Sequence, residues 1–281
     1  MNALEIKNLS KSFGDFSLDN LNLTLPSGCI MGLIGENGAG KSTTIKLILN
    51  MLRRDSGSIT ILGRDNEENI ALTKEDVGVV MDEAGIPECL TAQQVGKVMR
   101  YTFKNWDDAE YRRLLTKLSL PENKPFKEFS RGMKMKLGIA IAMSHGAKLL
   151  LLDEPTSGLD PVVRDEVVEM FYDFTRDENH SILISSHIVS DLEKLCDYVA
   201  FLHRGKLLLC EEKDVLLAEY GIVQCTHEQL SELDADAVRY KKETPYGVQI
   251  MMHRADIPDG FKVIPISIEE LFVFMVKEER E

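Results

Sequence analysis

Long apolar runs are missing from this chain. No stretch of its 281 residues approaches the roughly 18 consecutive apolar residues that a membrane-spanning helix needs. The first residues, Met1 to Lys7, also lack the basic and then apolar segments of a secretory signal. We therefore expect a protein with neither a membrane span nor a leader of its own.

Cysteine and positive charge are also scarce. The 5 cysteines are scattered and form no C-x-x-C pair, which favours a reducing cytoplasm with cysteines packed as small apolar residues. The 33 basic residues are outnumbered by 46 acidic ones, and the net charge of −13 argues against wrapping nucleic acid. Internal repeats and low-complexity tracts are absent as well. The remaining composition, 44% hydrophobic and 28% charged, is ordinary for a globular chain of about two domains.

A phosphate-binding pattern lies near the start of the chain. The pattern G-x-x-x-x-G-K-[ST] is met at every required position by Gly35, Glu36, Asn37, Gly38, Ala39, Gly40, Lys41 and Ser42, with Thr43 next. The apolar run 29–34 predicts a buried strand before the loop, and residues 43–49 predict a helix after it. Backbone amides at such a helix N-terminus bind phosphate, while Lys41 reaches the β- and γ-phosphates and Ser42 ligates Mg²⁺. The segment predicts a nucleotide site.

A second strong signal lies in the apolar run 148–152, which ends in Asp153 and Glu154. Such a run predicts a central parallel strand with carboxylates at its C-terminal end, the edge at which open α/β sheets bind ligands. Asp153 would hold Mg²⁺ directly or through water. Glu154 would face the γ-phosphate as the general base for the attacking water.

Three further motifs narrow the family. Ser130-Arg131-Gly132-Met133 precedes a predicted helix, Ser157-Gly158-Leu159-Asp160 follows the acidic pair, and Ser185-Ser186-His187 ends another apolar strand. In this order the motifs resemble the ATPase subunit of ATP-binding cassette (ABC) transporters, over roughly residues 1–215. The resemblance implies an α/β fold, a P-loop NTPase cassette whose core sheet carries an antiparallel β subdomain and a helical subdomain.

The resemblance also implies how the site is completed. Two cassettes pair head to tail around two ATP molecules, so each site combines the phosphate loop of one subunit with the signature motif of the other. Ser130 and Gly132 would then offer a hydroxyl and an unobstructed amide to the partner's γ-phosphate. Ser130 can also cap the following helix. His187 would contact the γ-phosphate as a switch, and Asp160 would communicate across the dimer.

Phe13 matches the position whose aromatic ring stacks on adenine, with Phe16 as a nearby competitor. Two positions depart from the family pattern. Asp82 stands where Gln is usual, beside the strand expected to end near residue 81, and its carboxylate can ligate Mg²⁺. Arg131 replaces the first signature Gly, and it could contact nucleotide or partner acids or point to solvent.

A shift in composition near residue 216 predicts two domains, and the resemblance implies that the first is the cassette. Residues 1–215 form the cassette, with a helical subdomain at about 83–146, and residues 216–281 form an α+β appendage. Tails of this kind occur in the drug- and peptide-export branch. The appendage ends in a helix over 267–279 with Ile268, Leu271, Phe272 and Met275 on one face. It carries no chemical motif, and a packing role is the favoured interpretation.

We therefore expect the ATP-hydrolysing subunit of an ABC exporter with Mg²⁺, paired as a homodimer and held at the inner face of the cell membrane by a separate permease. The segment 82–90 and the helical subdomain would receive that permease. Ile86, Pro87 and Leu90 would be its contacts or, as the alternative, would pack in the core. The alternative is an ABC ATPase without a permease that acts as a nucleotide-gated clamp or scaffold regulator.

Overall fold

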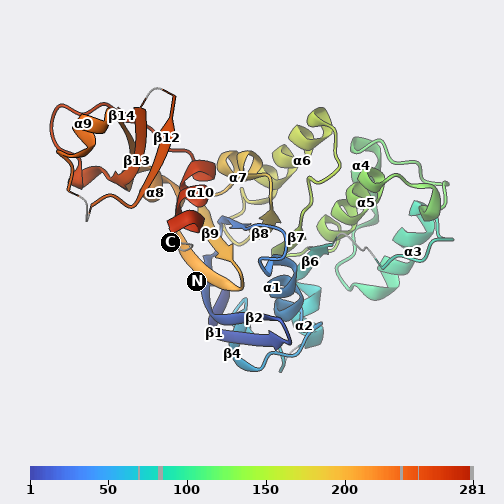
Figure 1. Ribbon diagram of the computed structural model, residues 1–281. Helices are drawn as coiled ribbons and strands as arrows, with labels where there is room; N and C mark the ends of the chain where they lie inside the picture. The colour runs from blue at the N-terminus through green and yellow to red at the C-terminus, as the bar shows by residue number, and fades with distance from the viewer. Residues whose placement is uncertain (69, 82–84, 235–236, 246, 279–281) are drawn as a thin grey trace.

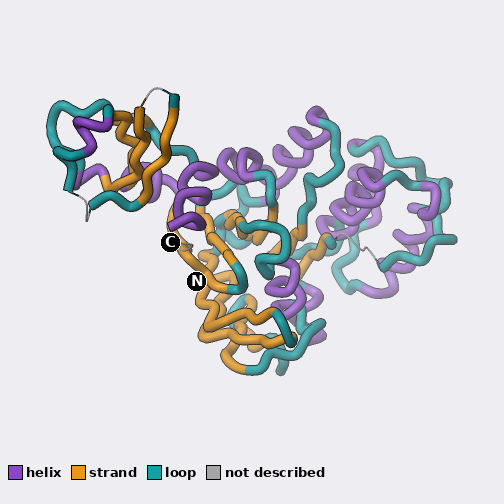
Figure 2. The backbone as a smooth tube through the Cα atoms, viewed as in Figure 1, coloured by secondary structure: helices purple, strands orange, loops and turns teal. Residues whose placement is uncertain are grey.

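A computed structural model describes residues 1–68, 70–81, 85–234, 237–245 and 247–278 (Figure 1). Its strands form three sheets (Figure 2). The first sheet is antiparallel in the order β2-β1-β4-β5, and its strands are β1 Asn2–Phe13, β2 Phe16–Pro26, β4 Ser56–Ile61 and β5 Arg64–Asp65. The predicted antiparallel strands at the N-terminus are thus present.

The central sheet carries the motifs. Its order is β10-β9-β3-β8-β7-β6, and it contains β3 Ile30–Ile34, β6 Val77–Val80, β7 Leu149–Asp153, β8 Ser181–Ser186, β9 Tyr198–His203 and β10 Lys206–Glu212. All neighbours in it are parallel except β10, which runs antiparallel to β9. Since parallel strands end at one edge, the segments that follow β3, β7 and β8 meet there.

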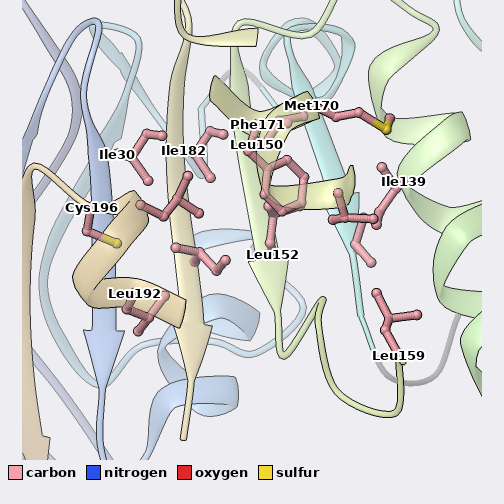
Figure 3. Packing of buried hydrophobic residues seen from close by; sticks show 14 of the residues in the cluster. Ile30, Ile139, Leu150, Leu152, Leu159, Met170, Phe171, Ile182, Leu192 and Cys196 are labelled. Carbon is pink, nitrogen blue, oxygen red and sulfur yellow. The ribbon is translucent and has the colours of Figure 1, made fainter. Parts of the chain in front are cut away.

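The central strands are buried on both faces, which explains their continuous apolar runs. Ile30, Leu150 and Ile182 lie on one face of the sheet, where they pack against helices (Figure 3). Their neighbours Met31, Leu151 and Leu183 belong to a second buried cluster on the other face. The second face packs on α1 and on the antiparallel sheet. The helices that flank the sheet are α1 Lys41–Ile48, α2 Ile70–Glu75, α6 Pro161–Phe174 and α7 Val189–Leu195.

A helical subdomain occupies the right of Figure 1, next to β6. It contains α3 Ala92–Thr102, α4 Asp108–Lys117, the 3-10 turn η1 Phe126–Glu128 and α5 Arg131–Met143. Each helix begins at a residue whose side chain accepts a hydrogen bond from the first turn, namely Thr91, Asp107 and Ser130. The helical character expected of this segment and the predicted cap at Ser130 are present.

The C-terminal region forms the third sheet, in the order β12-β13-β11-β14. Its elements are α8 Lys213–Glu219, β11 Tyr220–Cys225, α9 His227–Leu230, β12 Tyr240–Thr244, β13 Gly247–His253, the turn η2 Arg254–Asp256, β14 Val263–Ile264 and α10 Ile268–Glu278. The sheet has a small core of its own, but α10 returns to pack against α7 and β12. The expected α+β character of this region is present.

Candidate nucleotide site

The phosphate loop connects β3 to α1 at the C-terminal edge of the central sheet. Gly40, with φ of 111°, lies in the left-handed region that favours glycine, and α1 begins at Lys41 directly after it. The Lys41 side chain is 6% exposed, and its Nζ donates to the carbonyls of Gly35 at 2.7 Å and Glu36 at 3.3 Å. The carbonyls of the loop thus hold its cation in place.

Glu154 is held from three sides. Its backbone has φ of 53°, and its amide donates to the backbone oxygen and the hydroxyl of Ser185, both at 3.1 Å. One carboxylate oxygen accepts from Nδ1 of His187 at 2.6 Å, and the other lies 3.5 Å from Nζ of Lys41. The structure therefore brings together the predicted base, the predicted switch histidine and the phosphate-loop lysine.

Asp153 is 5% exposed at the end of β7, and its Oδ1 accepts from the hydroxyl of Ser185 on β8 at 2.6 Å. The remaining carboxylate oxygen and the Ser42 hydroxyl are the hard oxygen donors that Mg²⁺ prefers. Within the described residues, no group of three or more His, Cys, Asp or Glu side chains is arranged to hold a metal. This donor set fits an ion bound by few protein ligands together with phosphate and water.

The signature segment lies beside the segment that follows β7. The Ser130 hydroxyl accepts from the amide of Met133 at 3.2 Å, so Ser130 opens α5 from an exposed position. A Cβ at Gly132 would lie 3.3 Å from Leu159 and 3.4 Å from the carbonyl of Gly158, so a larger residue would crowd this contact. Asp160 in turn caps α6, accepting from the amide of Val163 at 3.1 Å.

An open cavity of about 720 Å³ lies beside the phosphate loop and the Glu154–His187 pair. Its lining consists of Phe16, Glu36, Asn37, Gly38, Ala39, Gly40, Lys41, Ser42, Thr43, Arg131, Glu154, Ser157 and His187. The cavity therefore joins the backbone amides of a phosphate loop to a carboxylate–histidine pair. This arrangement can bind a nucleoside triphosphate and present a water to its terminal phosphate.

Comparison with known proteins agrees with this geometry. Residues 18–157 match the family model described as ABC transporter. The lantibiotic transport ATP-binding protein SrtF of Streptococcus pyogenes is 39% identical over 214 residues, which cover 75% of this chain and 91% of SrtF. The chain belongs to the ABC transporter ATP-binding family.

Other matches agree with this assignment. The bacitracin transport ATP-binding protein BcrA of Bacillus licheniformis is 37% identical over 73% of this chain and 68% of its own length. The solved structure of an ATP-binding subunit of an ABC transporter superposes with a TM-score of 0.70 at 28% identity, covering 76% of this chain and 91% of that one. The predicted family, the P-loop cassette fold and the ATPase class are thus confirmed.

Several predicted site residues in the described part of this ABC ATPase are not part of the cavity lining, namely Phe13, Gly35, Ser130, Gly132, Asp153 and Asp160. Phe13 is 40% exposed, and the Lys11 amine lies 5.4 Å from the centre of its ring, while Phe16 lines the cavity instead. A Cβ at Gly40 would lie 2.9 Å from the Phe16 ring, so Phe16 packs on the start of α1, next to the phosphate-binding end. Phe13 as the adenine-stacking residue stays a prediction. Asp82 lies outside the described residues, and its proposed metal role likewise stays a prediction.

The sequence did not reveal the role of Ser185 in the ABC site. This serine orders both acids, since it donates to Asp153 and accepts from the amide of Glu154. The only signal was the pair of serines before His187 at the end of an apolar strand. The carboxylate of Glu36 also has a partner, because it lies 3.3 Å from Nδ1 of His203 at the end of β9. The two residues are far apart in the sequence, so no motif spacing could predict this contact.

Proposed function

We propose that this chain is the ATP-hydrolysing subunit of an export-type ABC transporter, which pairs with a second copy around two Mg-ATP and drives a separate membrane subunit. The observation that carries the proposal is the Lys41–Glu154–His187 arrangement at the mouth of the phosphate loop. The names of the relatives, which refer to lantibiotic and bacitracin transport, support the drug- and peptide-export branch.

The geometry suggests the order of events in hydrolysis. Incoming phosphates compete with the carboxylate for Lys41, which lies 3.5 Å from Glu154 before nucleotide binds. Glu154 then takes a proton from the attacking water as the water oxygen bonds to the γ-phosphorus and the bond to ADP breaks. His187 keeps the carboxylate oriented through the 2.6 Å hydrogen bond. Ser42 and Asp153, with Asp82 as a further candidate, would hold Mg²⁺, which would supply neutralising charge on the phosphates.

The second copy is needed because the signature residues face outward. Ser130 is exposed at the N-terminus of α5, where its hydroxyl and the helix dipole favour an incoming phosphate. The phosphate loop and the signature are both present in this chain, so two identical copies would complete both sites. We therefore propose a head-to-tail homodimer, with Asp160 near the contact between subunits.

A second cavity fits the membrane subunit. It measures about 340 Å³ and lies between β6 and the helical subdomain, lined mostly by apolar residues that include Met51, Val79, Ile86, Met99 and Ile141. Met51 is 59% exposed there. Ile86 was predicted at this contact, whereas Pro87 and Leu90 are not part of the lining. We propose that this groove, defined as the β6–α3–α5 groove, receives an apolar helix of the permease.

The proposed location follows from that partner. No helix in the described part of the chain is both long and apolar enough to cross a bilayer. Attachment to the inner face of the cell membrane would therefore come from the permease. We propose no nucleic-acid partner.

The testing experiment is affinity purification of the tagged chain from native membranes in mild detergent, followed by mass spectrometry. We expect a multi-span protein in stoichiometric amount, and replacement of Ile86 by Asp in the groove should release it while ATP binding persists. Recovery of soluble partners alone, with ATPase activity intact, would contradict the transporter proposal. It would favour an ABC ATPase that acts without a permease as a nucleotide-gated clamp or scaffold regulator.

A further inference from the structure

The end of β9 lies directly beside the phosphate loop. β3 and β9 are parallel neighbours, so the loop that follows β3 passes the last residues of β9. A Cβ at Gly35 would lie 2.5 Å from the carbonyl oxygen of Leu202, which shows how close the two segments are. The next residue of each segment is Glu36 or His203, and Oε2 of Glu36 lies 3.3 Å from Nδ1 of His203. The first two loop residues are therefore packed on the end of β9.

His203 is the fixed partner in this contact. Its side chain is 2% exposed, whereas that of Glu36 is 46% exposed. The turn after β9 is tied to the phosphate loop, since the amide of Gly205 donates to the carbonyl of Ala39 at 3.0 Å. The same turn is tied to β2, because the amide of Asp19 donates to the carbonyl of Gly205 at 2.9 Å. The position of the histidine is thus set by the fold, and the position of the carboxylate depends on the contact.

The charge of Glu36 gives this contact a consequence. The residues that line the nucleotide cavity include Glu36 and Glu154, and each of these carboxylates lies against a histidine. Glu154 has a task in the proposed mechanism, whereas Glu36 has none, and its negative charge would oppose that of a triphosphate in the same cavity. A carboxylate oxygen only accepts hydrogen bonds, so its proximity favours a proton on Nδ1 of His203. The histidine therefore attracts the carboxylate toward β9.

We infer that His203 is a positioning residue for the nucleotide site, which holds the carboxylate of Glu36 at the end of β9 and so keeps this charge away from the phosphates of ATP. The inference deepens the proposed function and rests on ATP binding at the phosphate loop. His203 is not among the residues that line the cavity, so it acts on the nucleotide through Glu36. Loss of the histidine should therefore weaken ATP binding only while residue 36 carries a charge.

The test measures dissociation constants for Mg-ATP by calorimetry on the full chain. We expect His203→Leu, which keeps a side chain of similar volume at the buried position, to weaken binding about five-fold, the modest effect typical of partly exposed charges. Glu36→Gln alone should change the dissociation constant by less than about two-fold. Glu36→Gln in the His203→Leu background should restore nearly wild-type affinity, because a neutral amide does not repel phosphate.

The matched control is Glu211→Gln in the same His203→Leu background. It removes one unit charge from an exposed position on β10, outside the cavity lining, and it should leave binding weak. Equal rescue by this control would overturn the inference in favour of bulk charge. Rescue by neither variant would overturn it in favour of a histidine that supports the loop by packing alone, and so would wild-type affinity in His203→Leu.

A further variant tests the contact without changing the buried position. Glu36→Asp keeps the charge at a partly exposed site, but its side chain is one methylene shorter and loses the 3.3 Å approach to Nδ1 of His203. We expect it to weaken Mg-ATP binding as His203→Leu does, whereas Glu36→Gln should not. Wild-type affinity in Glu36→Asp would contradict the inference. A wild-type chain that binds no ATP would instead refute the proposed function.

Discussion

Glu154 depends on its neighbours more than on its own backbone preference. A glutamate at φ of 53° adopts a conformation that non-glycine residues seldom take, and the Ser185 and His187 hydrogen bonds hold it there. We expect Glu154→Gln to keep ATP binding, to lower turnover by about 10²–10⁴-fold, and to accumulate an ATP-bound dimer. Turnover assays with sedimentation check this. Wild-type turnover in the variant would show that another group takes the water proton.

Phe13 and Phe16 differ in their exposure and in the groups that they contact. Phe16 packs against the start of α1 and lines the cavity, whereas Phe13 is more exposed and remains the residue predicted to stack on the base. We expect Phe13→Ala to raise the dissociation constant for ATP about five-fold, consistent with an aromatic contact of about 1 kcal/mol, and Phe13→Tyr to leave it unchanged. Calorimetric titration measures both variants. If Phe16→Ala alone weakened binding, the base would be assigned to Phe16.

The free energy of unfolding should depend on pH through His145. Burial lowers the pKa of this imidazole, although its Nδ1 donates to the carbonyl of Glu75 at 3.1 Å. The unfolded chain therefore takes up the proton more readily, and the free energy of unfolding should fall as the pH drops below the ordinary histidine pKa of about 6.5. We expect His145→Phe, which retains stacking on Phe103, to reduce this slope in urea unfolding at pH 5 and pH 7. An unchanged slope would place the titration elsewhere.

At the scale of elements, one polar network joins the segment after β7 to two helices. Thr156, 1% exposed, donates to Asp191 of α7 at 3.0 Å, and Nε of Arg164 on α6 lies 3.6 Å from the same carboxylate oxygen. The network fixes α7, which begins two residues after His187. Elements that carry Glu154 and His187 are thereby held in one arrangement.

Loss of the Asp191 carboxylate should therefore lower the free energy of unfolding. Asp191→Ala would leave the buried Thr156 hydroxyl without its acceptor, so we expect a loss of about 1–3 kcal/mol in the free energy of unfolding, together with slower ATP turnover. Urea unfolding and a turnover assay test it. Asp173→Ala is the control, because the Asp173–Arg176 pair is largely exposed and should change neither quantity measurably. A stable, fully active Asp191→Ala would show that packing alone holds α7.

Elements were predictable where the pattern was local. The apolar runs of β7 and β8 and the cap at Ser130 specify their own structure, and the motif order placed Asp153, Glu154 and His187 at one sheet edge. Contacts between distant segments could not be predicted from the sequence, because no local pattern encodes them. The approach of Arg131 to Gly158 and the hydrogen bond from Ser185 to Asp153 arise only when strands and subdomains pack.

At the scale of the whole molecule, one of the buried clusters crosses the expected domain boundary at residue 215. Phe272 and Leu271 of α10 belong to the same buried cluster as Leu192 of α7 and Phe201 of β9, and the Phe201 and Phe272 rings meet edge-on at 5.3 Å. The boundary expected from composition falls within α8, before the third sheet begins at β11. It does not show that the last helix returns to the cassette, because that contact spans about 70 residues of sequence.

This shared core predicts a single unfolding transition for the chain. Phe272→Ala would leave a cavity against Phe201, and we expect it to lower the free energy of unfolding by about 3–5 kcal/mol while unfolding stays cooperative. Scanning calorimetry measures both properties. Val273→Ala is the matched control on α10, since this side chain is 40% exposed and should cost well under 1 kcal/mol. Two separate transitions in the wild-type chain would show instead that the C-terminal region folds independently, with α10 adding little to the stability of the cassette.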